Sequence, residues 1–221
     1  GRMTHAVFVR SPHAHARIVR VDKTAAAAAP GVIAVFDGDD VAADGVNGLP
    51  CGWLITSTDG QPMKEPPHPV LAHGKARYVG DHVAMVIAET LEQARNAAEL
   101  VEVEYEPLDA VVDVRDAKNG PALHEAAPDN HCYKWAIGDK AQVDAAFAGA
   151  AHVTKLDLIN NRLVPNAMEP RAAIGAYNRA TDDYTLYVAN QSPHVERLLM
   201  TAFVLGLPEH KVRVIAPDVG G

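Results

Sequence analysis

Cysteines and long hydrophobic runs are scarce in this sequence. Cys51 and Cys132 are its two cysteines, and their wide separation supports neither a disulfide framework nor a CxxC metal motif. A reducing compartment, the cytoplasm, is therefore the expected location. No apolar run approaches the ~18 residues that a membrane-spanning helix needs, so no transmembrane segment is predicted. The first residues also lack the charged start and apolar block of a signal peptide.

A block of basic residues is also missing. The formal net charge is −8 at pH 7, which argues against nucleic acid or an anionic membrane as a partner. What is present is 221 residues, of which 48% are hydrophobic and 22% charged. This is the composition of a globular protein, and the length suits one large or two small domains.

The first half of the chain predicts a mixture of strands and helices. Short strands are predicted at 5–9, 18–22 and 32–36. The run HVAMVIAE at 82–89 is continuously apolar and has the length of a buried strand. Thr90 and Gln93 have the spacing of a capping box, which predicts a helix at 91–100, and a strand follows at 101–105. Strand, helix and strand together predict a βαβ-like unit.

Two stretches of the sequence lack clear periodicity. Residues 37–69 are rich in Gly, Pro and Asp and predict a long excursion, and loops of that length are usually functional or covered by a partner. One interpretation is therefore a non-catalytic binding module that uses this excursion as its contact surface. Residues 113–135 combine weak periodicity with several helix breakers, which is typical of a linker.

The second half predicts a helix, a hairpin, a further helix and a strand. Asp139 and Gly149 are the expected start and end of the first helix. The segments 171–177 and 184–189 flank a polar turn and predict a hairpin. The next helix is expected to begin at a Ser192 cap, to end at Gly206 and to precede a strand at 211–217. Its expected apolar face consists of Val195, Leu198, Leu199, Ala202 and Phe203.

Several histidines, a cysteine and an acid–base pair are candidates for chemistry. His13 and His15 would point to one face of an extended strand and could hold a metal, as in a metal hydrolase, but the three or four ligands that zinc needs are not apparent. The simpler interpretation is a polar strand end.

Cys51 is expected to be a buried or half-buried apolar residue. His68 and His73 are expected in solvated loop, and Glu169 and Arg171 are expected to form an ion pair or to fix a chain crossing.

Gln191 is the most informative single residue. It lies where a predicted strand ends and a capped helix begins, which is where α/β proteins place ligands. Its amide can donate and accept, although a turn glutamine that bonds its own backbone is the simpler interpretation. Gly220 and Gly221 follow the last strand in the same way and are typical of a glycine-rich turn or of a flexible tail.

Five segments of the chain together resemble the molybdenum-binding large subunit of the xanthine dehydrogenase and aldehyde oxidase family. The branch that includes the aerobic carbon monoxide dehydrogenase large subunit is the most similar. The segments are FVRSPHAHARI, PGVIAVFDGDD, RYVGDHVAMVIAETLEQARNAAELVEVEYEPLDAVVD, MEPRAAIGAY and NQSPHVERLLMTAFVLGLPEHKVRVIAPDVGG. They occur in the family's order and cover most of the chain, whereas residues 47–69 and 118–135 match less clearly.

The resemblance implies an α+β protein. Residues 1–115 would form an α/β-hammerhead domain, 116–138 a linker, and 139–221 the first part of a molybdenum-cofactor-binding domain. In the family the last strand continues into a GGGFGxK loop against the cofactor, so we expect this chain to be an N-terminal fragment. By position, Gln191 matches the glutamine whose amide faces an oxo ligand of molybdenum, and Gly220 and Gly221 match the start of the loop. Glu169 matches a position expected to be structural.

The resemblance also implies an activity. The family hydroxylates a small substrate, such as carbon monoxide, an aldehyde or an N-heterocycle, with water as the oxygen source. The implied cofactor is molybdopterin cytosine dinucleotide carrying molybdenum, and electrons pass to [2Fe–2S] clusters and FAD. The implied partners are an iron–sulfur small subunit, an FAD-binding medium subunit and the remainder of the large subunit, assembled as a dimer of heterotrimers. No catalytic residue and no direct metal ligand is expected within these 221 residues.

Overall fold

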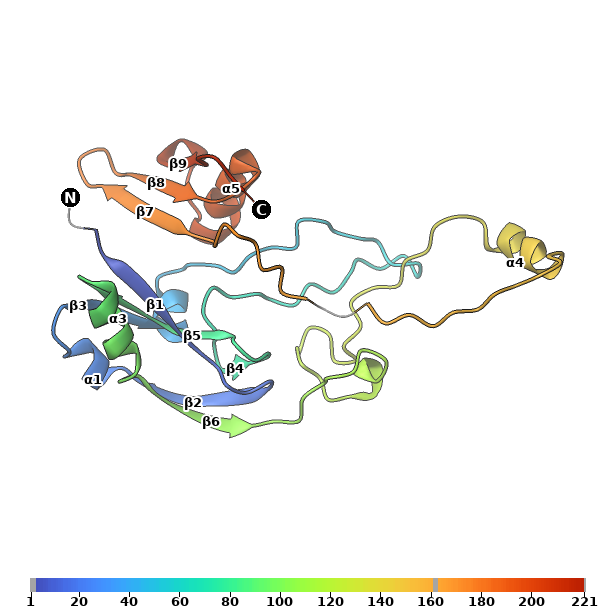
Figure 1. The fold of residues 1–221 in the computed structure, drawn as a ribbon, viewed down its shortest axis with the longest axis horizontal. Helices are drawn as coiled ribbons and strands as arrows, with labels where there is room; N and C mark the ends of the chain where they lie inside the picture. The colour runs from blue at the N-terminus through green and yellow to red at the C-terminus, as the bar shows by residue number, and fades with distance from the viewer. Residues whose placement is uncertain (1–2, 161–162, 221) are drawn as a thin grey trace.

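Two neighbouring lobes and a long arm make up the fold (Figure 1). The computed structural model describes residues 3–160 and 163–220. The first lobe contains β1 (His5–Arg10), β2 (Ala16–Asp22), α1 (Thr24–Ala27), β3 (Val32–Asp37), α2 (Gly38–Ala43), β4 (Lys75–Ala76), β5 (His82–Ala88), α3 (Leu91–Ala98) and β6 (Glu102–Pro107). A loop with η1 (Ala117–Asn119) follows this lobe, and the arm, from residue 134 to 164, carries α4 (Lys140–Ala148). The second lobe contains β7 (Ala173–Asn178), β8 (Asp183–Val188), α5 (Pro193–Leu198), η2 (Leu199–Leu205), η3 (Glu209–Lys211) and β9 (Val212–Ile215).

The first lobe is built on two three-stranded sheets, with strand orders β1-β5-β3 and β4-β2-β6. β5 is the continuously apolar strand that the sequence predicted, and it is central in its sheet, with α3 packed against it and against β1. The core between these elements consists of small side chains: Ala26, Ala84, Val86, Ala97 and Val101. Small side chains let α1 and α3 lie close to the sheet, which explains why alanine is so common in this part of the sequence.

The predicted capping box is confirmed at the start of α3. The Thr90 backbone N–H donates to Gln93 Oε1 at 3.0 Å, and the Gln93 backbone N–H donates to Thr90 Oγ1 at 3.2 Å. The βαβ-like interpretation is wrong, however. β1 and β3 already pair with both edges of β5, so β6 cannot join that sheet and pairs antiparallel with β2 instead. The alternation in VEVEY, with one face wet, is confirmed in β6.

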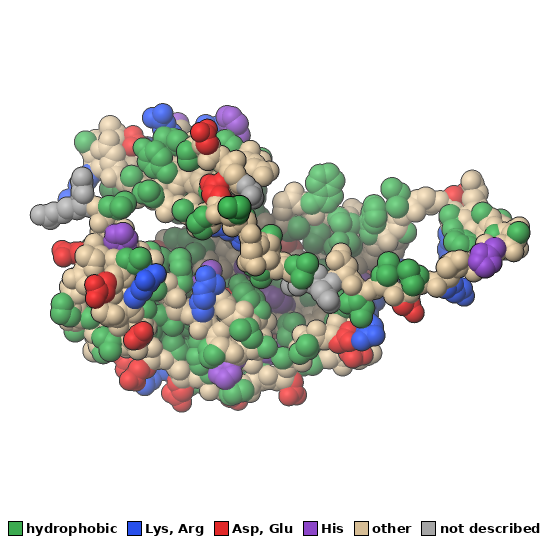
Figure 2. All heavy atoms as spheres, in the orientation of Figure 1, with side chains coloured by type: hydrophobic (Ala, Val, Ile, Leu, Met, Phe, Trp, Pro, Cys, Tyr) green, Lys and Arg blue, Asp and Glu red, His purple; other side chains and the backbone are tan. Residues whose placement is uncertain are grey.

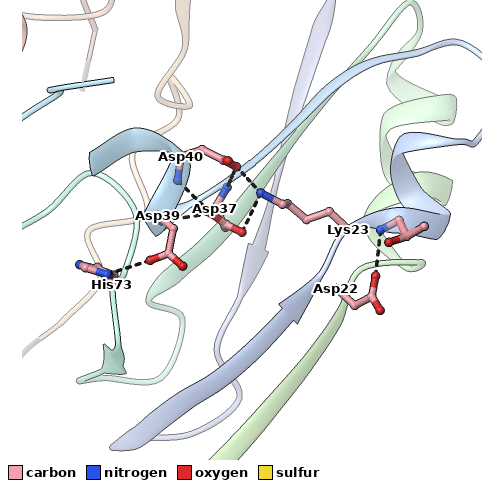
Figure 3. Close-up of polar contacts among 7 residues, drawn as sticks. Asp22, Lys23, Asp37, Asp39, Asp40 and His73 are labelled. Carbon is pink, nitrogen blue, oxygen red and sulfur yellow. Dashed lines mark hydrogen bonds and ion pairs between the residues drawn. The ribbon is translucent and has the colours of Figure 1, made fainter. Parts of the chain in front are cut away.

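The segment predicted as a long excursion begins with a helix, α2, and then continues as loop. Asp37 caps α2, and Lys23 bridges the Asp37 and Asp40 carboxylates, with 2.8 Å between Lys23 Nζ and Asp37 Oδ2 (Figure 3). Hydrogen bonds from Lys23 and from the Asp37 backbone lower the pKa of Asp40. Further along, the loop pairs with another part of its own chain, because Thr58 N–H donates to the Lys134 carbonyl at 2.8 Å.

The segment predicted as a linker contains a loop held by one side chain. Asn130 Nδ2 donates to the carbonyl oxygens of Ala117 and Pro121, both at 2.8 Å, and its Oδ1 accepts from Leu123 N–H at 2.9 Å. Asn130 itself has a left-handed backbone with φ 51°, which asparagine tolerates better than most residues. Residues 117–130 are therefore fixed locally, and the proposed boundaries of the linker stay a prediction.

The second lobe is a three-stranded sheet of order β7-β8-β9, covered by the α5 and η2 helices. β7 and β8 form the predicted hairpin, and β9 pairs parallel with β8. The helix between β8 and β9 changes from α to π at Leu199, and Gly206 ends it in the left-handed conformation with φ 63°. The two lobes meet at this helix, since Asn47 N–H donates to the Val204 carbonyl at 2.8 Å.

Two details of the last helix differ from the sequence prediction. Ser192 makes no side-chain capping bond. The buried residues of the helix are Thr201 and Val204, while Val195, Leu198 and Phe203 are at least 43% exposed. The predicted apolar face assumed a period of 3.6 residues throughout, and the π-helical turns that begin at Leu199 rotate Phe203 away from that face. Val195 and Leu198 precede these turns and are exposed in the α-helical part.

The arm is almost devoid of packing. Every residue from Lys134 to Ile159 is exposed, and α4 lies at the far end of the arm, in yellow in Figure 1. Asp139 caps α4 as predicted, accepting from Gln142 N–H at 3.0 Å. Apolar side chains follow the arm, as Figure 2 shows, and those of Ile137, Leu156, Leu158 and Val164 are all more than 75% exposed. No helix in the described part of the chain is long and apolar enough to cross a membrane.

Candidate functional site

The candidate site lies at one edge of the β7-β8-β9 sheet. β8 and β9 are parallel, so the segments that follow them leave the sheet at the same edge. β7 is antiparallel to β8, so the segment that precedes β7 lies at this edge too. The strand pairing thus brings together the segments that carry Glu169, Gln191 and Gly220, which are distant in the sequence. Carboxyl ends of parallel strands are where sheets of this kind bind ligands.

Gln191 is exposed between the end of β8 and the start of α5. In the described part of the chain its side-chain amide has no hydrogen-bond partner, so the simpler interpretation, a turn glutamine bonded to its own backbone, is not what the structure shows. Its neighbours are fixed instead. Asn190 Oδ1 accepts from Ser192 N–H at 2.6 Å, and Asn190 Nδ2 donates to Glu196 Oε2 at 2.8 Å.

Asn190 is a residue that sequence analysis missed. Its side chain forms a turn immediately before the helix, whereas the capping bond expected from Ser192 is absent, because an asparagine side chain can bond the backbone two residues further on. The signal was present in the sequence as an asparagine two residues before the expected cap. Gln191 thus lies between two residues that hydrogen bonds fix, while its own side-chain amide has no hydrogen-bond partner among the described residues.

Gly220 also lies at this edge, and its backbone N–H donates to the Glu169 carboxylate. A Cβ at position 220 would lie 3.1 Å from Glu169 Oε2, so glycine fits here with little room for a side chain. Glu169 forms no ion pair with Arg171 in the described part of the chain; it fixes a chain crossing, which is the second of the two predicted roles. Gly221 lies outside the described residues.

The other candidates do not assemble into a site. His13 and His15 lie in a bend and not in a strand, so the shared-face geometry is absent. The His15 Nδ1 atom is 2.7 Å from the Asp109 carbonyl, and His73 Nε2 is 2.8 Å from Asp39 Oδ1 (Figure 3). The described residues contain no group of three or more His, Cys, Asp or Glu side chains that could hold a metal ion.

Cys51 and His68 also have ordinary surroundings. Cys51 is exposed, so the expectation of a buried or half-buried residue is wrong, because its proline- and glycine-rich loop packs against no core. His68 lines a cavity of about 280 Å³ with Arg77, Tyr78, Asp81 and His124. Burial and then the charge of Arg77 lower the pKa of His124, and its Nδ1 atom is buried without a partner.

Both lobes match described protein families. Residues 1–109 match the family described as "Aldehyde oxidase and xanthine dehydrogenase, a/b hammerhead domain", and residues 123–221 match the "Molybdopterin cofactor-binding domain". The fold is therefore a hammerhead domain followed by the start of a molybdopterin-binding domain. The chain belongs to the xanthine dehydrogenase and aldehyde oxidase family.

Individual relatives agree with this assignment. The chain is 37% identical to the carbon monoxide dehydrogenase large chain of Afipia carboxidovorans, over 97% of its own length and 27% of the relative's. It is 35% identical to the nicotine 6-hydroxylase large subunit of Paenarthrobacter nicotinovorans, over 98% of its own length and 26% of the relative's. The structure of reconstituted CO dehydrogenase from Oligotropha carboxidovorans superposes with a TM-score of 0.86 at 35% identity, covering 100% of this chain and 28% of that one. The chain thus spans about a quarter of these relatives.

Proposed function

We propose that this chain forms part of the large subunit of a molybdenum-dependent hydroxylase. The observation that carries the proposal is the edge of the second lobe, where the free Gln191 amide and the Gly220 backbone follow two parallel strands. The proposed substrate is small: carbon monoxide, an aldehyde or an N-heterocycle. Relatives named for carbon monoxide and for nicotine have nearly equal identity to this chain, so the class of substrate stays open.

The residues at this edge fit the cofactor. Gln191 offers a neutral donor that has no competing partner, and Gly220 has no side chain to keep a flat ligand away. The described residues provide no metal-binding cluster, so the organic part of the cofactor, which we propose is the cytosine dinucleotide form of molybdopterin, would hold the metal. When bound, this cofactor supplies two-electron oxidation of the substrate, with water as the source of oxygen.

The proposed role of Gln191 is electrostatic. Its N–H would donate to an anionic oxygen of the bound cofactor, and a donor that is already in place stabilises developing negative charge without reorganising. The bonds from Asn190 to Ser192 and Glu196 hold the backbone of the turn, so the backbone around Gln191 is ordered before its side-chain amide binds. Gly220, and by extension Gly221, would lie against the cofactor through the backbone.

The proposed assembly contains further subunits. Relatives of this chain are named as large chains or as a subunit of a complex, which supports partner subunits. We propose an iron–sulfur subunit that carries [2Fe–2S] clusters and an FAD-binding subunit, in a dimer of heterotrimers in the cytoplasm. The exposed apolar side chains of the arm support burial against the remainder of a large subunit.

Metal analysis tests the proposal. The protein purified from its source with its partners should contain about one molybdenum and one pterin per copy of this chain. The 221-residue chain alone should retain neither after gel filtration and should oxidise no substrate of these classes, because its candidate edge is open to solvent. A purified assembly without molybdenum, or turnover by the 221-residue chain alone, would overturn the proposal.

A further inference from the structure

One hydrogen bond joins two segments that flank the outer strands at the candidate edge. Glu169 lies before β7, and Gly220 follows β9; these are the two outer strands of the sheet, with β8 between them. Outer strands of a three-stranded sheet lie roughly 10 Å apart, which is two strand spacings. The bond between the Glu169 carboxylate and the Gly220 N–H therefore joins the segment before β7 to the segment after β9, at the end of the sheet where β8 leads to Gln191.

Glu169 is less exposed than the residues around it. Glu169 is half-buried, while the described residues on both sides of it, from Leu163 to Asp182, are exposed. Its apolar neighbour Met168 is 95% exposed. The Gly220 N–H is the hydrogen-bond partner of the Glu169 carboxylate.

Gly220 is suited to this contact by its size. The Cβ of any other residue would approach Glu169 Oε2 to 3.1 Å and Glu169 Cβ to 3.8 Å. The first of these distances is tighter than ordinary contact, so a larger residue at position 220 would require the end of the Glu169 side chain to shift by a few tenths of an ångström. Glycine at position 220 allows the bond without that shift.

We infer that Glu169 is a positioning residue for the candidate site, holding the glycine segment at a fixed place relative to Gln191. This inference rests on the proposed function for the identity of the ligand, but the contact itself needs no ligand. An ionised carboxylate accepts this bond strongly, a glutamine side chain accepts it more weakly, and alanine does not accept it.

Amide exchange in the 221-residue chain tests the contact. With ¹⁵N-glycine labelling, exchange of the Gly220 amide should accelerate about ten- to a hundredfold in Glu169→Ala, the loss expected for a bond to a charged acceptor. Glu169→Gln should fall between Glu169→Ala and the wild type. Asp182→Ala is the matched control, because Asp182 bonds Lys211 at the opposite edge of the same sheet. It should leave the Gly220 exchange rate unchanged, and slow exchange in β8 would show that the sheet persists in each variant.

A second measurement separates this inference from the proposed function. In the purified assembly, Glu169→Ala should lower the molybdenum content relative to the wild type, and Glu169→Gln should restore part of it. An unchanged Gly220 exchange rate in Glu169→Ala, or a full molybdenum content in that variant, would overturn the positioning role. Changed exchange together with a wild-type assembly that lacks molybdenum would support the contact and refute the proposed function.

Discussion

The side chains around Gln191 determine which polar groups at the candidate edge are available to a ligand. Asn190 and Glu196 fix the turn, and the Gln191 amide between them has no partner in the described chain. An exposed side-chain amide without a hydrogen-bond partner among the described residues adds little to stability, so its replacement should affect binding and chemistry and not the fold.

Replacing Gln191 by alanine tests this at the residue scale. In the cofactor-loaded assembly, Gln191→Ala should reduce the rate of reduction by substrate by roughly 10²–10³, the usual effect of removing one preorganised donor. Gln191→Glu should be at least as damaging, because an ionised carboxylate would be repelled by an anionic oxygen. The measurement is rapid-mixing reduction with molybdenum determined in each variant.

The matched control is Gln61→Ala, since Gln61 is an exposed loop glutamine whose described hydrogen bonds use only its backbone. It should leave the rate unchanged. A wild-type rate in fully loaded Gln191→Ala would mean that Gln191 is only a turn residue.

His124 predicts a pH dependence of stability. Burial, and then the charges of Arg77 and of nearby histidines, lower its pKa in the folded protein. The unfolded chain, with a histidine pKa of about 6.5, therefore binds the proton more readily. Stability should be unaffected well above pH 6.5 and should fall as the pH drops from about 7 to 5. His82, whose pKa burial also lowers, acts in the same direction.

Urea unfolding between pH 7.5 and 5.5 measures this effect. The loss of stability should be smaller in His124→Gln than in the wild type. His152→Gln, which replaces an exposed histidine of the arm, is the control and should keep the wild-type slope. Equal slopes in all three proteins would contradict the prediction.

At the scale of the element, the π-helix η2 is the unusual feature. Its backbone bonds join residues five apart and not four, as the bond from Gly206 N–H to the Thr201 carbonyl does. Thr201 is fully buried, and its hydroxyl donates to the Arg197 carbonyl at 2.7 Å. The Thr201 carbonyl accepts from Leu207 N–H at 2.9 Å, and the Val204 carbonyl accepts from Asn47 N–H in the other lobe. The π-helix is therefore fixed both by its own side chains and by the first lobe.

Thr201→Val tests this element. Valine keeps the shape but leaves the Arg197 carbonyl without its bond, so unfolding should become easier by about 1–2 kcal/mol. Urea denaturation followed by circular dichroism measures the change. Thr181→Val, at an exposed turn, should change stability by less than about 0.5 kcal/mol. An equal effect of the two substitutions would show that the buried hydroxyl is not needed.

At the scale of the molecule, the arm and the loop 117–130 differ in order. The loop is held by Asn130, whereas residues 149–160 are exposed and belong to no helix or strand. In the 221-residue chain, chymotrypsin should cleave at Leu156 and Leu158 before it cleaves at Leu123 in the loop, with mass spectrometry identifying the fragments. Asn130→Ala should accelerate cleavage at Leu123 alone. First cuts in that loop of the wild type would contradict this order.

Much of this architecture could be predicted from the sequence, for reasons that individual residues illustrate. Thr90 and Gln93 marked the start of α3, and the apolar run of β5 marked a central strand, because both signals are local. The pairing of strands depends on residues that are distant in the sequence and has no local signal. β6 pairs with β2 because both edges of β5 are already occupied. The π-helical turns after Leu198 also have no simple periodic signature, so the buried Thr201 and Val204 were missed.

The candidate site was predictable only in part. Gln191 and Gly220 could be selected from their places after strands and from a family resemblance, and the structure shows why those places are shared. The bond from Gly220 to Glu169 could not be predicted, because it depends on β7 and β9 lying on opposite sides of β8.

The β7-β8-β9 sheet therefore has two ends with different tolerances to mutation. At one end, Lys211 bonds the Asp182 carboxylate and the Thr181 carbonyl, at 3.1 and 3.3 Å, and joins the β7–β8 turn to the start of β9. At the other end, Glu169 and Gly220 join the segments beside Gln191. A saturation-mutagenesis map should accordingly be asymmetric along the strands. Substitutions at the Lys211 end should register in protein abundance alone, while substitutions at the Gln191 end should register in activity at normal abundance.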